Sequence, residues 1–418
     1  MDLLQYKPKA QFAQRHLLTL QDYTPDEILQ VLSLAAKLKL QRKLGMDQTH
    51  ILRGKNVALI FTKPSMRTRV SFEVGVQQLG GHALYISGPE IGLGTRESVY
   101  DVANVLSRFV DGIMIRTFHQ SDVEGLAKYG QIPVINGLTD DYHPCQVLAD
   151  LLTLYEHKGA LAGKKLAFVG DGNNMANSLM IICSKLGVDV AIATPAAYAP
   201  QETYVSWAKE NAKAAGSTVT ITTDIAEALR GADAVYTDVW ASMGMEAETE
   251  KRARDFVDYQ VNSAVLKLAK PDAIFLHCLP AHRGSEVTDE VMDGPQSVVF
   301  DEAENRLHAQ KAVLALLMAA DEPFSVFEAN CQCFTNRPLI GIITKIDSPY
   351  ANVPMVRNWM VNSGCERIFE VSNLTREGIQ ELLDYLQEDP VRLTLEQAKA
   401  RQRLGLTEWE DASRFGLA

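Results

Sequence analysis

Short runs of β-branched and apolar residues alternate along this chain with longer stretches whose apolar residues recur at helical spacing. This alternation is typical of β-α-β units, in which a helix crosses between two parallel strands. The expected strands are residues 56–62, 112–117, 165–169, 188–194, 234–238 and 273–277. We therefore predict an α/β protein built on parallel sheets.

Two breaks in this alternation predict the domain boundaries. The 418 residues indicate two or three domains, at about 150 residues per domain. The first break is a stretch of small residues, flanked by glycines at 159 and 163, between a long helical pattern and the strand at 165. The second is Asp321-Glu322-Pro323, where the alternation of strands and helices ends. We predict two α/β domains, residues 1–157 and 158–322, and a small C-terminal α/β appendage, residues 323–418.

The charge balance and the cysteines exclude several classes of protein. The chain has 41 basic and 52 acidic residues, a net charge of −11, so we expect no broad electrostatic binding to nucleic acid or membrane. The longest apolar run, residues 312–320, is too short for a bilayer, and the N-terminus lacks a signal-peptide core. Six cysteines without a CxxC pair indicate neither zinc nor disulfides. We expect a soluble, cytoplasmic protein whose anionic ligands are bound by a few local arginines.

The first chemical motif is Ser65-Met66-Arg67-Thr68-Arg69, which follows the strand at 56–62. It opens a helical pattern, so backbone N–H groups, two hydroxyls and two arginines converge at one helix N-terminus. Such an end attracts anions, and a phosphate would fit it. The alternative is a capping serine followed by solvated arginines.

Two further motifs stand at helix and strand ends. His143-Pro144-Cys145-Gln146 begins a helical pattern, because proline is favoured in the first turn. His277 to His282 (HCLPAH) follows the strand at 273–277, at the end of a sheet where ligands bind. Alone, His143 could equally be a capping or core histidine, and Cys278 a buried thiol.

The segment Gly170 to Met175 follows a strand and superficially resembles a dinucleotide-binding turn. Met175 replaces the third glycine, and the next strand ends at Thr194 without a carboxylate for a ribose. The dehydrogenase hypothesis therefore fails both of its sequence tests. The same turn could instead present Asn174 to a polar substrate.

In this order and spacing, the motifs resemble those of the aspartate/ornithine carbamoyltransferase family over residues 16–317. Arg116 in MIRTF, DVWASMG at 238–244 and ENRLH at 304–308 add to the match. The resemblance implies that the first domain binds carbamoyl phosphate and the second the amino acid, while the last helix returns to the first domain. It also implies a homotrimer or a multiple of trimers, with no metal or other cofactor.

The ornithine-type motif at 238–244 implies transfer of the carbamoyl group from carbamoyl phosphate to the side-chain amine of L-ornithine, a reaction of arginine metabolism. Putrescine or an acylated ornithine is the alternative acceptor. The same residues would serve citrulline synthesis and arginine breakdown, so the direction stays open.

Matched residue by residue, the family pattern predicts two adjoining sites. The positions that match the carbamoyl-phosphate site are Ser65, Met66, Arg67, Thr68, Arg116, His143, Gln146 and Arg306. Those that match the ornithine site are Asn174, Asp238, Ser242, Met243, Cys278 and Leu279. The resemblance assigns catalysis to Arg67, Arg116, His143 and Cys278; the first three would donate to the charge that builds on the carbonyl oxygen.

The sequence departs from the family pattern at two positions. Met66 replaces the commoner threonine, which removes a hydroxyl but keeps the backbone N–H. In the loop at 89–97, many relatives place a glutamine that reaches a neighbouring subunit's carbamoyl phosphate, and Gly92 is the best match here. The sequence therefore leaves that intersubunit contact open.

Residues 335–386 resemble a different family, the second half of a P-loop GTPase of the ethanolamine/propanediol-utilisation type. They contain a strand at 339–343, the motif Thr344-Lys345-Ile346-Asp347, a helix, a strand at 367–371 and a final helix. In complete relatives the aspartate that corresponds to Asp347 binds the guanine base, but this chain contains no GxxxxGK[ST] loop to bind the phosphates. We expect a docking or vestigial segment, with a nucleotide-sensing module as the alternative.

Overall fold

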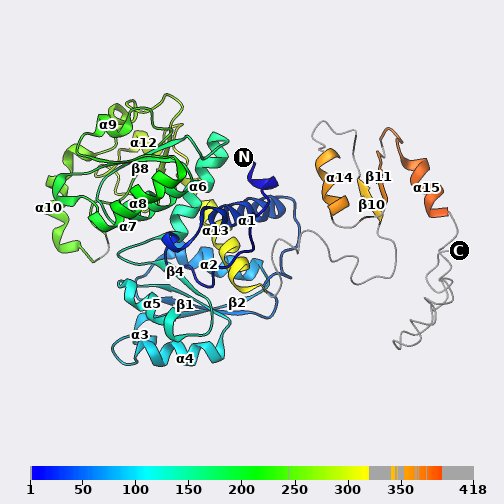
Figure 1. Ribbon diagram of the computed structural model, residues 1–418, viewed down its shortest axis with the longest axis horizontal. Coiled ribbons are helices and arrows are strands. Elements are labelled where there is room, and N and C mark those ends of the chain that lie inside the picture. The colour runs from blue at the N-terminus through cyan, green and yellow to red at the C-terminus, as the bar shows by residue number, and fades with distance from the viewer. Residues whose placement is uncertain are drawn as a thin grey trace. The chain divides into compact units, whose positions relative to one another are not determined.

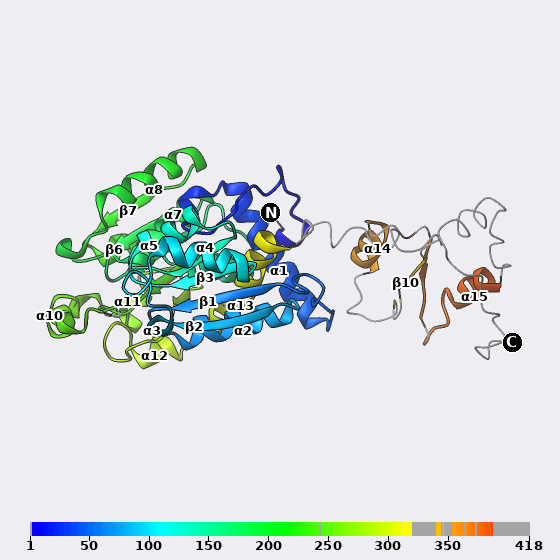
Figure 2. The same ribbon diagram turned by 90° about the horizontal axis from the view of Figure 1, so that it is seen from below.

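The structure, a computed structural model, describes residues 2–242 and 244–319 and, near the C-terminus, parts of 340–387. The chain divides into two units, residues 1–323 and 324–418, which we treat separately. In the first unit two parallel sheets follow one another along the chain (Figures 1 and 2). The α/β fold class predicted from the alternating pattern is confirmed.

The first sheet has four parallel strands in the order β2-β1-β3-β4. Their bounds are β1 Asn56–Phe61, β2 His82–Ser87, β3 Gly112–Arg116 and β4 Val134–Leu138. The central strands β1 and β3 are almost entirely buried, because helices cover both faces of such a sheet. One core forms from β1, β3 and the helices α4 (Val99–Phe109) and α5 (Gln120–Tyr129).

The second sheet has five parallel strands in the order β7-β6-β5-β8-β9. Their bounds are β5 Lys165–Val169, β6 Asp189–Ala193, β7 Val219–Thr222, β8 Ala234–Thr237 and β9 Ile274–His277. Its core includes residues of α9 (Ile225–Leu229), α11 (Ser263–Leu266) and α12 (Asp289–Met292). The helices α7 (Asn174–Lys185) and α8 (Glu202–Ala215) pack on each other. Each predicted domain thus contains one sheet, and we keep the boundary after residue 157 as a proposal.

The remaining elements of the first unit connect and cover these sheets. The other α-helices are α1 Pro25–Lys43, α2 Met66–Gln78, α3 Gly88–Ile91, α6 Pro144–Lys158, α10 Thr249–Asp255 and α13 Val299–Met318. Short 3₁₀ helices are η1 Leu3–Gln5, η2 Leu20–Asp22, η3 Ala196–Tyr198, η4 Glu246–Glu248 and η5 Val257–Tyr259. Within the described residues, none of the helices is long and apolar enough to cross a membrane.

The last helix of this unit, α13, packs against α1, α2 and α6. These three helices precede the second sheet in the chain, so α13 packs against a part of the chain that is distant in sequence. Buried polar side chains fix its position. Asn305 accepts a hydrogen bond from Lys39 Nζ at 2.7 Å and donates to Thr153 Oγ1 at 2.9 Å, and Lys311 Nζ donates to Gln78 Oε1 at 3.0 Å.

Three strands were not predicted from the sequence, namely β2, β4 and β7. β2 and β7 lie at sheet edges, and their half-exposed residues do not form a continuous apolar run. β4 contains Asn136-Gly137, a pair that indicates a turn when it is read locally. The six strands that were predicted are all present, with ends that differ by one residue at most.

In the second unit, β10 (Ile340–Ile343) and β11 (Arg367–Glu370) form a parallel pair. The helices α14 (Val353–Asn362) and α15 (Ile379–Gln387) accompany them. Both predicted strands are therefore present. The predicted motif residues Thr344, Lys345 and Asp347 lie outside the described residues.

The free energy of unfolding should depend on pH through the buried side chain of Lys311. Burial and the nearby Arg42 lower its pKa from 10.5 to about 8. Between pH 8 and pH 10.5 Lys311 is protonated in the unfolded chain but mostly neutral in the folded protein. The free-energy cost of burying Lys311 therefore falls as the pH rises through this range. The wild type should therefore gain stability relative to Lys311→Met, by at most about 1.4 kcal/mol per pH unit. Urea unfolding of both proteins across the window measures this difference, and a difference independent of pH would contradict the argument.

Candidate active site

The strand orders place the predicted motifs at two topological switch points. β2 and β3 lie on opposite sides of β1, and β6 and β8 lie on opposite sides of β5. Ligands of open parallel sheets bind outside the carboxyl ends of the strands at such points. Ser65 follows β1 and Arg116 ends β3, while Asn173 follows β5 and Asp238 follows β8. The topology therefore brings the motifs to the ends of the sheets that favour a site.

The N-terminus of α2 forms the first part of the site. Ser65 Oγ accepts a hydrogen bond from the backbone N–H of Thr68 at 3.3 Å, so Ser65 caps the helix, and its role in binding an anion remains a prediction. The buried Thr68 Oγ1 also accepts from Arg306 Nη2 of α13 at 2.9 Å. A positive side chain from a distant segment thus joins the positive end of a helix dipole.

Three guanidinium groups, those of Arg67, Arg116 and Arg306, share this region. Burial and the other two arginines lower the pKa of Arg116 to about 9. Burial also lowers the pKa values of Arg67 and Arg306. Like charges held together in a buried place disfavour their own ionisation. An anion bound among them would relieve this repulsion.

Buried polar atoms without a partner occur on the same residues. Within the described part of the chain they include Arg116 Nε, Arg306 Nε, His143 Nδ1 and Gln146 Oε1. Burial and the three arginines hold the pKa of His143 well below its usual range, so its ring is neutral at pH 7. Because buried polar atoms are nearly always hydrogen-bonded, these atoms are available to a ligand with anionic oxygens and an uncharged polar group.

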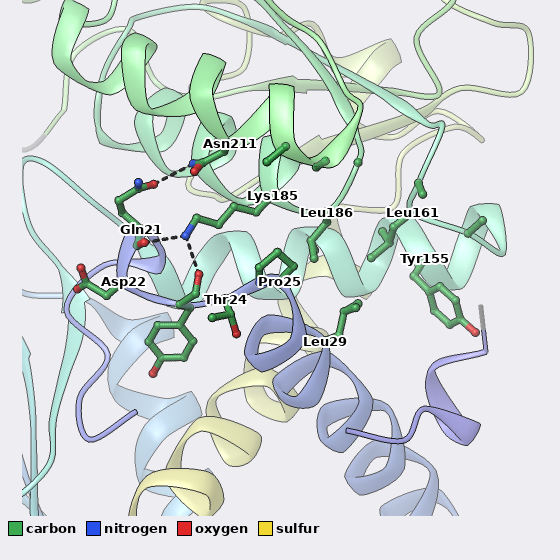
Figure 3. Close-up of a pocket in the computed structure, with 16 residues that line it drawn as sticks. Gln21, Asp22, Thr24, Pro25, Leu29, Tyr155, Leu161, Lys185, Leu186 and Asn211 are labelled. Carbon is green, nitrogen blue, oxygen red and sulfur yellow. Dashed lines mark hydrogen bonds between the residues drawn. The ribbon is translucent and has the colours of Figure 1, made fainter. Parts of the chain in front are cut away.

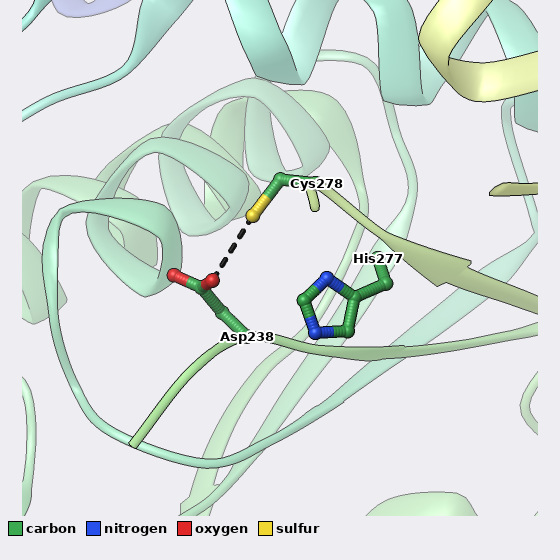
Figure 4. Close-up of side chains that lie close together, drawn as sticks. All are labelled: Asp238, His277 and Cys278. Atoms are coloured by element: carbon green, nitrogen blue, oxygen red, sulfur yellow. Dashed lines mark hydrogen bonds between the residues drawn. The ribbon is translucent and has the colours of Figure 1, made fainter. Parts of the chain in front are cut away.

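Asp238 and Cys278 form the second part of the site (Figure 4). The thiol of Cys278 donates to Asp238 Oδ1 at 3.0 Å. Burial and the charge of Asp238 raise the pKa of this thiol well above its usual range, so the sulfur stays protonated. The charge of Asp238 opposes the lowering of the pKa of Arg67, so this carboxylate lies within electrostatic reach of the arginine cluster.

His277 lies next to this pair and was not predicted as a site residue. Its Nδ1 accepts from the backbone N–H of Leu279 at 2.9 Å, and its Nε2 lies 3.2 Å from Glu286 Oε1. Possible ligand atoms of Asp238, His277 and Cys278 lie within 4.8 Å of one another, a spacing that could hold a metal ion. In the structure all three side chains take part in hydrogen bonds to protein atoms.

A buried ion pair supports the loop that follows Asp238. Arg252 Nη1 lies 2.7 Å from Asp171 Oδ2 and donates to the backbone oxygen of Trp240 at 2.9 Å. Ser242, predicted to bind ornithine, is half-buried in this loop. Met243 lies outside the described residues.

Three predicted residues have surroundings that the motifs did not indicate. Asn174 Nδ2 donates to the backbone oxygen of Thr139 at 2.7 Å and so links loops of the two sheets. Met66, the first residue of α2, is 69% exposed. Leu279 has a φ of 59° and packs against the core of the second sheet. The ligand roles of these residues remain predictions.

Gly92, the best match in sequence to the glutamine that the family resemblance implies, adopts a backbone conformation that favours glycine. It ends α3 with a φ of 57°, a conformation that favours glycine. A Cβ at this position would lie 2.7 Å from Arg96 Cβ. The residue therefore shapes the loop and offers no side chain for a ligand.

A cavity of about 760 Å³ lies away from these motifs, between the N-terminal segment and the helices α6, α7 and α8 (Figure 3). Lys185 Nζ donates to the backbone oxygens of Gln21 and Tyr23, each at 2.6 Å. Asn211 Nδ2 donates to Gln21 Oε1 at 2.9 Å. These polar groups already bind one another, so they tie the second domain to the N-terminal segment.

Two buried acids next to the site were also missed. Asp150 lies one helical turn after Gln146, and Glu302 lies one turn before Arg306. Gln146 Nε2 donates to both, at 2.9 Å and 3.0 Å. A spacing of four residues from a predicted site residue was the available signal, since such residues share a helix face.

Comparisons with known proteins agree with this geometry. Residues 15–156 match the family model "Aspartate/ornithine carbamoyltransferase, carbamoyl-P binding domain", and residues 162–317 match the "Asp/Orn binding domain" of the same family. An ornithine carbamoyltransferase of Pyrococcus abyssi is 56% identical over 304 residues, which are 73% of this chain and 96% of that protein. One from Caldicellulosiruptor saccharolyticus is 56% identical over 72% of this chain and 98% of that protein.

Solved structures show the same relationship. Ornithine carbamoyltransferase from Pyrococcus furiosus superposes with a TM-score of 0.73 at 54% identity, covering 75% of this chain and all of that one. The enzyme of Giardia lamblia gives a TM-score of 0.67 at 33% identity, over 74% and 99% of the two chains. The chain therefore belongs to the aspartate/ornithine carbamoyltransferase family. Within that family its relatives named here are ornithine carbamoyltransferases.

The C-terminal region matches a second family model, "Ethanolamine utilisation - propanediol utilisation", over residues 285–388. This match overlaps the end of the carbamoyltransferase range and includes β10, β11, α14 and α15. The resemblance of the tail to that family is confirmed.

Phosphate binding should test the arginine cluster. Inorganic phosphate should raise the melting temperature of the wild type, because a ligand that binds the folded state stabilises it. Arg67→Ala should lose most of this rise. Arg69→Ala is the matched control, since Arg69 stands on the same helix but pairs with Glu73 and stacks on Tyr85. Equal phosphate shifts in wild type and Arg67→Ala would place the anion elsewhere.

Proposed function

We propose that this protein transfers the carbamoyl group of carbamoyl phosphate to the side-chain amine of L-ornithine, giving L-citrulline and phosphate (EC 2.1.3.3). The observation that carries the proposal is the position of the Asp238–Cys278 pair beside a cluster of three arginines, of which Arg116 and Arg306 are buried and Arg67 is half-buried. The cluster suits a phosphorylated substrate, and the pair suits an amine. The 56% identity to ornithine carbamoyltransferases supports the same assignment.

The transfer needs charge stabilisation more than a nucleophile from the protein. The neutral amine attacks the carbamoyl carbon, negative charge develops on the carbonyl oxygen, and phosphate leaves. Arg67, Arg116 and His143 are the donors for this charge, and one well-placed donor can contribute about 10²–10³ in rate. Thr68, Gln146 and Arg306 complete the carbamoyl-phosphate pocket, with Ser65 and the backbone of Met66.

The acceptor site uses negative charge and hydrogen-bond acceptors. Asp238 neutralises the α-ammonium group of ornithine, and Ser242, Met243 and Asn174 surround that part of the molecule. Cys278 and Leu279 lie beside the attacking amine. The protonated thiol of Cys278 positions this amine through hydrogen bonding and does not form a covalent intermediate.

The assembly and location are part of the same proposal. We infer a homotrimer or a multiple of trimers, as the family resemblance implies, with the small-molecule substrates as the ligands. The cysteines favour a reducing compartment, so we place the enzyme in the cytoplasm.

Acceptor preference tests this function directly. With carbamoyl phosphate as the donor, the kcat/KM for L-ornithine should be higher than the kcat/KM for putrescine or for an Nα-acylated ornithine. Putrescine lacks the α-ammonium group that Asp238 binds, and acylation removes the charge of that group. The three amines are compared under identical conditions by colorimetric detection of the ureido product. A higher kcat/KM with putrescine would overturn the assignment.

Truncation separates the enzyme from a nucleotide-regulated protein. All assigned site residues lie at or before Arg306, and α13 ends at Met318. A chain that ends after Glu322 should therefore keep the kcat/KM of the full-length protein within about twofold, because the first unit contains every assigned residue. Full-length and truncated proteins are assayed with and without GTP, and GTP binding is measured by calorimetry. Micromolar binding of GTP, or a GTP effect that disappears on truncation, would show that the tail is regulatory.

A further inference from the structure

A pair of carboxylic acids, Asp150 and Glu302, lies fully buried beside the proposed carbamoyl-phosphate residues. The proposed transfer gives neither acid a role. Burying a carboxylate is costly unless other groups bind it, so the partners of this pair indicate what it does.

The two acids bind donors from three different elements. Gln146 Nε2 of α6 donates to Asp150 Oδ1 at 2.9 Å and to Glu302 Oε1 at 3.0 Å. The hydroxyl of Tyr236, on β8, donates to Glu302 Oε1 at 3.2 Å. The backbone N–H of His277, on β9, donates to Glu302 Oε2 at 2.9 Å. Glu302 therefore accepts three hydrogen bonds, one from the first domain and two from the second.

The two acids differ in how well their negative charge is supported. Burial and the charge of Glu302 raise the pKa of Asp150 well above its usual range. Burial also raises the pKa of Glu302, but the N–H of His277 and the hydroxyl of Tyr236 oppose this shift. Glu302 is therefore the acid of the pair that more readily carries a negative charge.

These hydrogen bonds fix the orientation of the side-chain amide of Gln146. An amide has a donor end and an acceptor end, and Asp150 and Glu302 both engage the donor end. Gln146 Oε1 is consequently the free end, and it is buried without a partner among the described residues. Gln146 stands in the first turn of α6, next to His143, whose Nδ1 is also buried and unpartnered.

We infer that Asp150 and Glu302 are positioning residues that hold the oxygen of Gln146 toward the carbamoyl amino group, and thereby select carbamoyl phosphate over acyl phosphates that lack this group. The inference rests on the function proposed above. A carbamoyl N–H can donate to Gln146 Oε1, whereas the methyl group of acetyl phosphate leaves that oxygen without a donor. An unsatisfied buried acceptor of this kind weakens binding by roughly tenfold to a hundredfold.

The test compares the binding of carbamoyl phosphate and acetyl phosphate, without any amine, by calorimetry or thermal shift. The double variant Asp150→Asn/Glu302→Gln keeps the shapes of both side chains but replaces the carboxylate of Glu302, which only accepts hydrogen bonds, by an amide that also donates. The amide of Gln146 is then free to turn. The wild-type preference for carbamoyl phosphate should fall about tenfold or more, mainly through weaker binding of carbamoyl phosphate, while the Kd for acetyl phosphate changes less than about threefold.

Two further variants separate positioning from folding. Lys311→Met removes another buried charge from α13, one bound to Gln48 and Gln78, and should keep the wild-type preference. Gln146→Leu removes the acceptor itself, so it should lose the preference to the same extent, and adding the acid substitutions to it should lower the preference no further. If the double variant fails to fold, Glu302→Gln alone serves, with a smaller loss of preference expected.

The outcomes distinguish this inference from the proposed function. If a folded acid variant keeps the wild-type preference, or if it weakens both ligands equally, the acids do not position Gln146 and the inference is wrong. If the wild type itself binds carbamoyl phosphate no better than acetyl phosphate, the proposed carbamoyl-phosphate site fails.

Discussion

The packing of α13 against the helices of the first sheet is the constraint on which the site depends. The helix belongs in sequence to the second domain, yet Arg306 contacts Thr68 at the start of α2, and Lys311 contacts Gln78 at the other end of the same helix. Because α13 brings Arg306 to Arg67 and Arg116, the proposed anion site is complete only when α13 has docked. The buried hydrogen bonds of Asn305 to Lys39 and Thr153 therefore support function as well as stability, because they hold the neighbouring Arg306 in place.

The charged groups near the site come from segments that are far apart in the chain. Arg67, Arg116 and Arg306 gather where the phosphate binds in the proposed function, while Asp238 lies beside Cys278 and the Asp150–Glu302 pair contacts Gln146. A chain with a net charge of −11 would repel a dianion at long range, but salt screens such repulsion beyond about 8–10 Å. Local groups in a buried place, where the effective dielectric constant is low, therefore decide which ligand binds.

The sequence predicted the parts of this molecule that have a local signature. Ser65 caps α2 and Pro144 begins α6, as their positions in the motifs indicate, because caps and first-turn prolines act over three or four residues. The edge strands β2 and β7 escaped prediction because partial exposure removes the apolar run on which recognition depends. Glu302 also escaped, because its importance comes from Gln146, Tyr236 and His277, which are distant in sequence and meet only in the folded chain.

The arginine cluster also bears on the protonation of the attacking amine. In the proposed reaction ornithine must keep its α-ammonium charge for Asp238 while its side-chain amine loses a proton before it attacks. In that function the three guanidinium groups place positive charge at the phosphate end of the site, and Asp238 places negative charge at the amino-acid end. A positive field disfavours a neighbouring ammonium ion, as it disfavours protonation of His143, whose pKa lies well below its usual range. The groups that stabilise the developing oxyanion thus also favour the neutral, nucleophilic form of the amine.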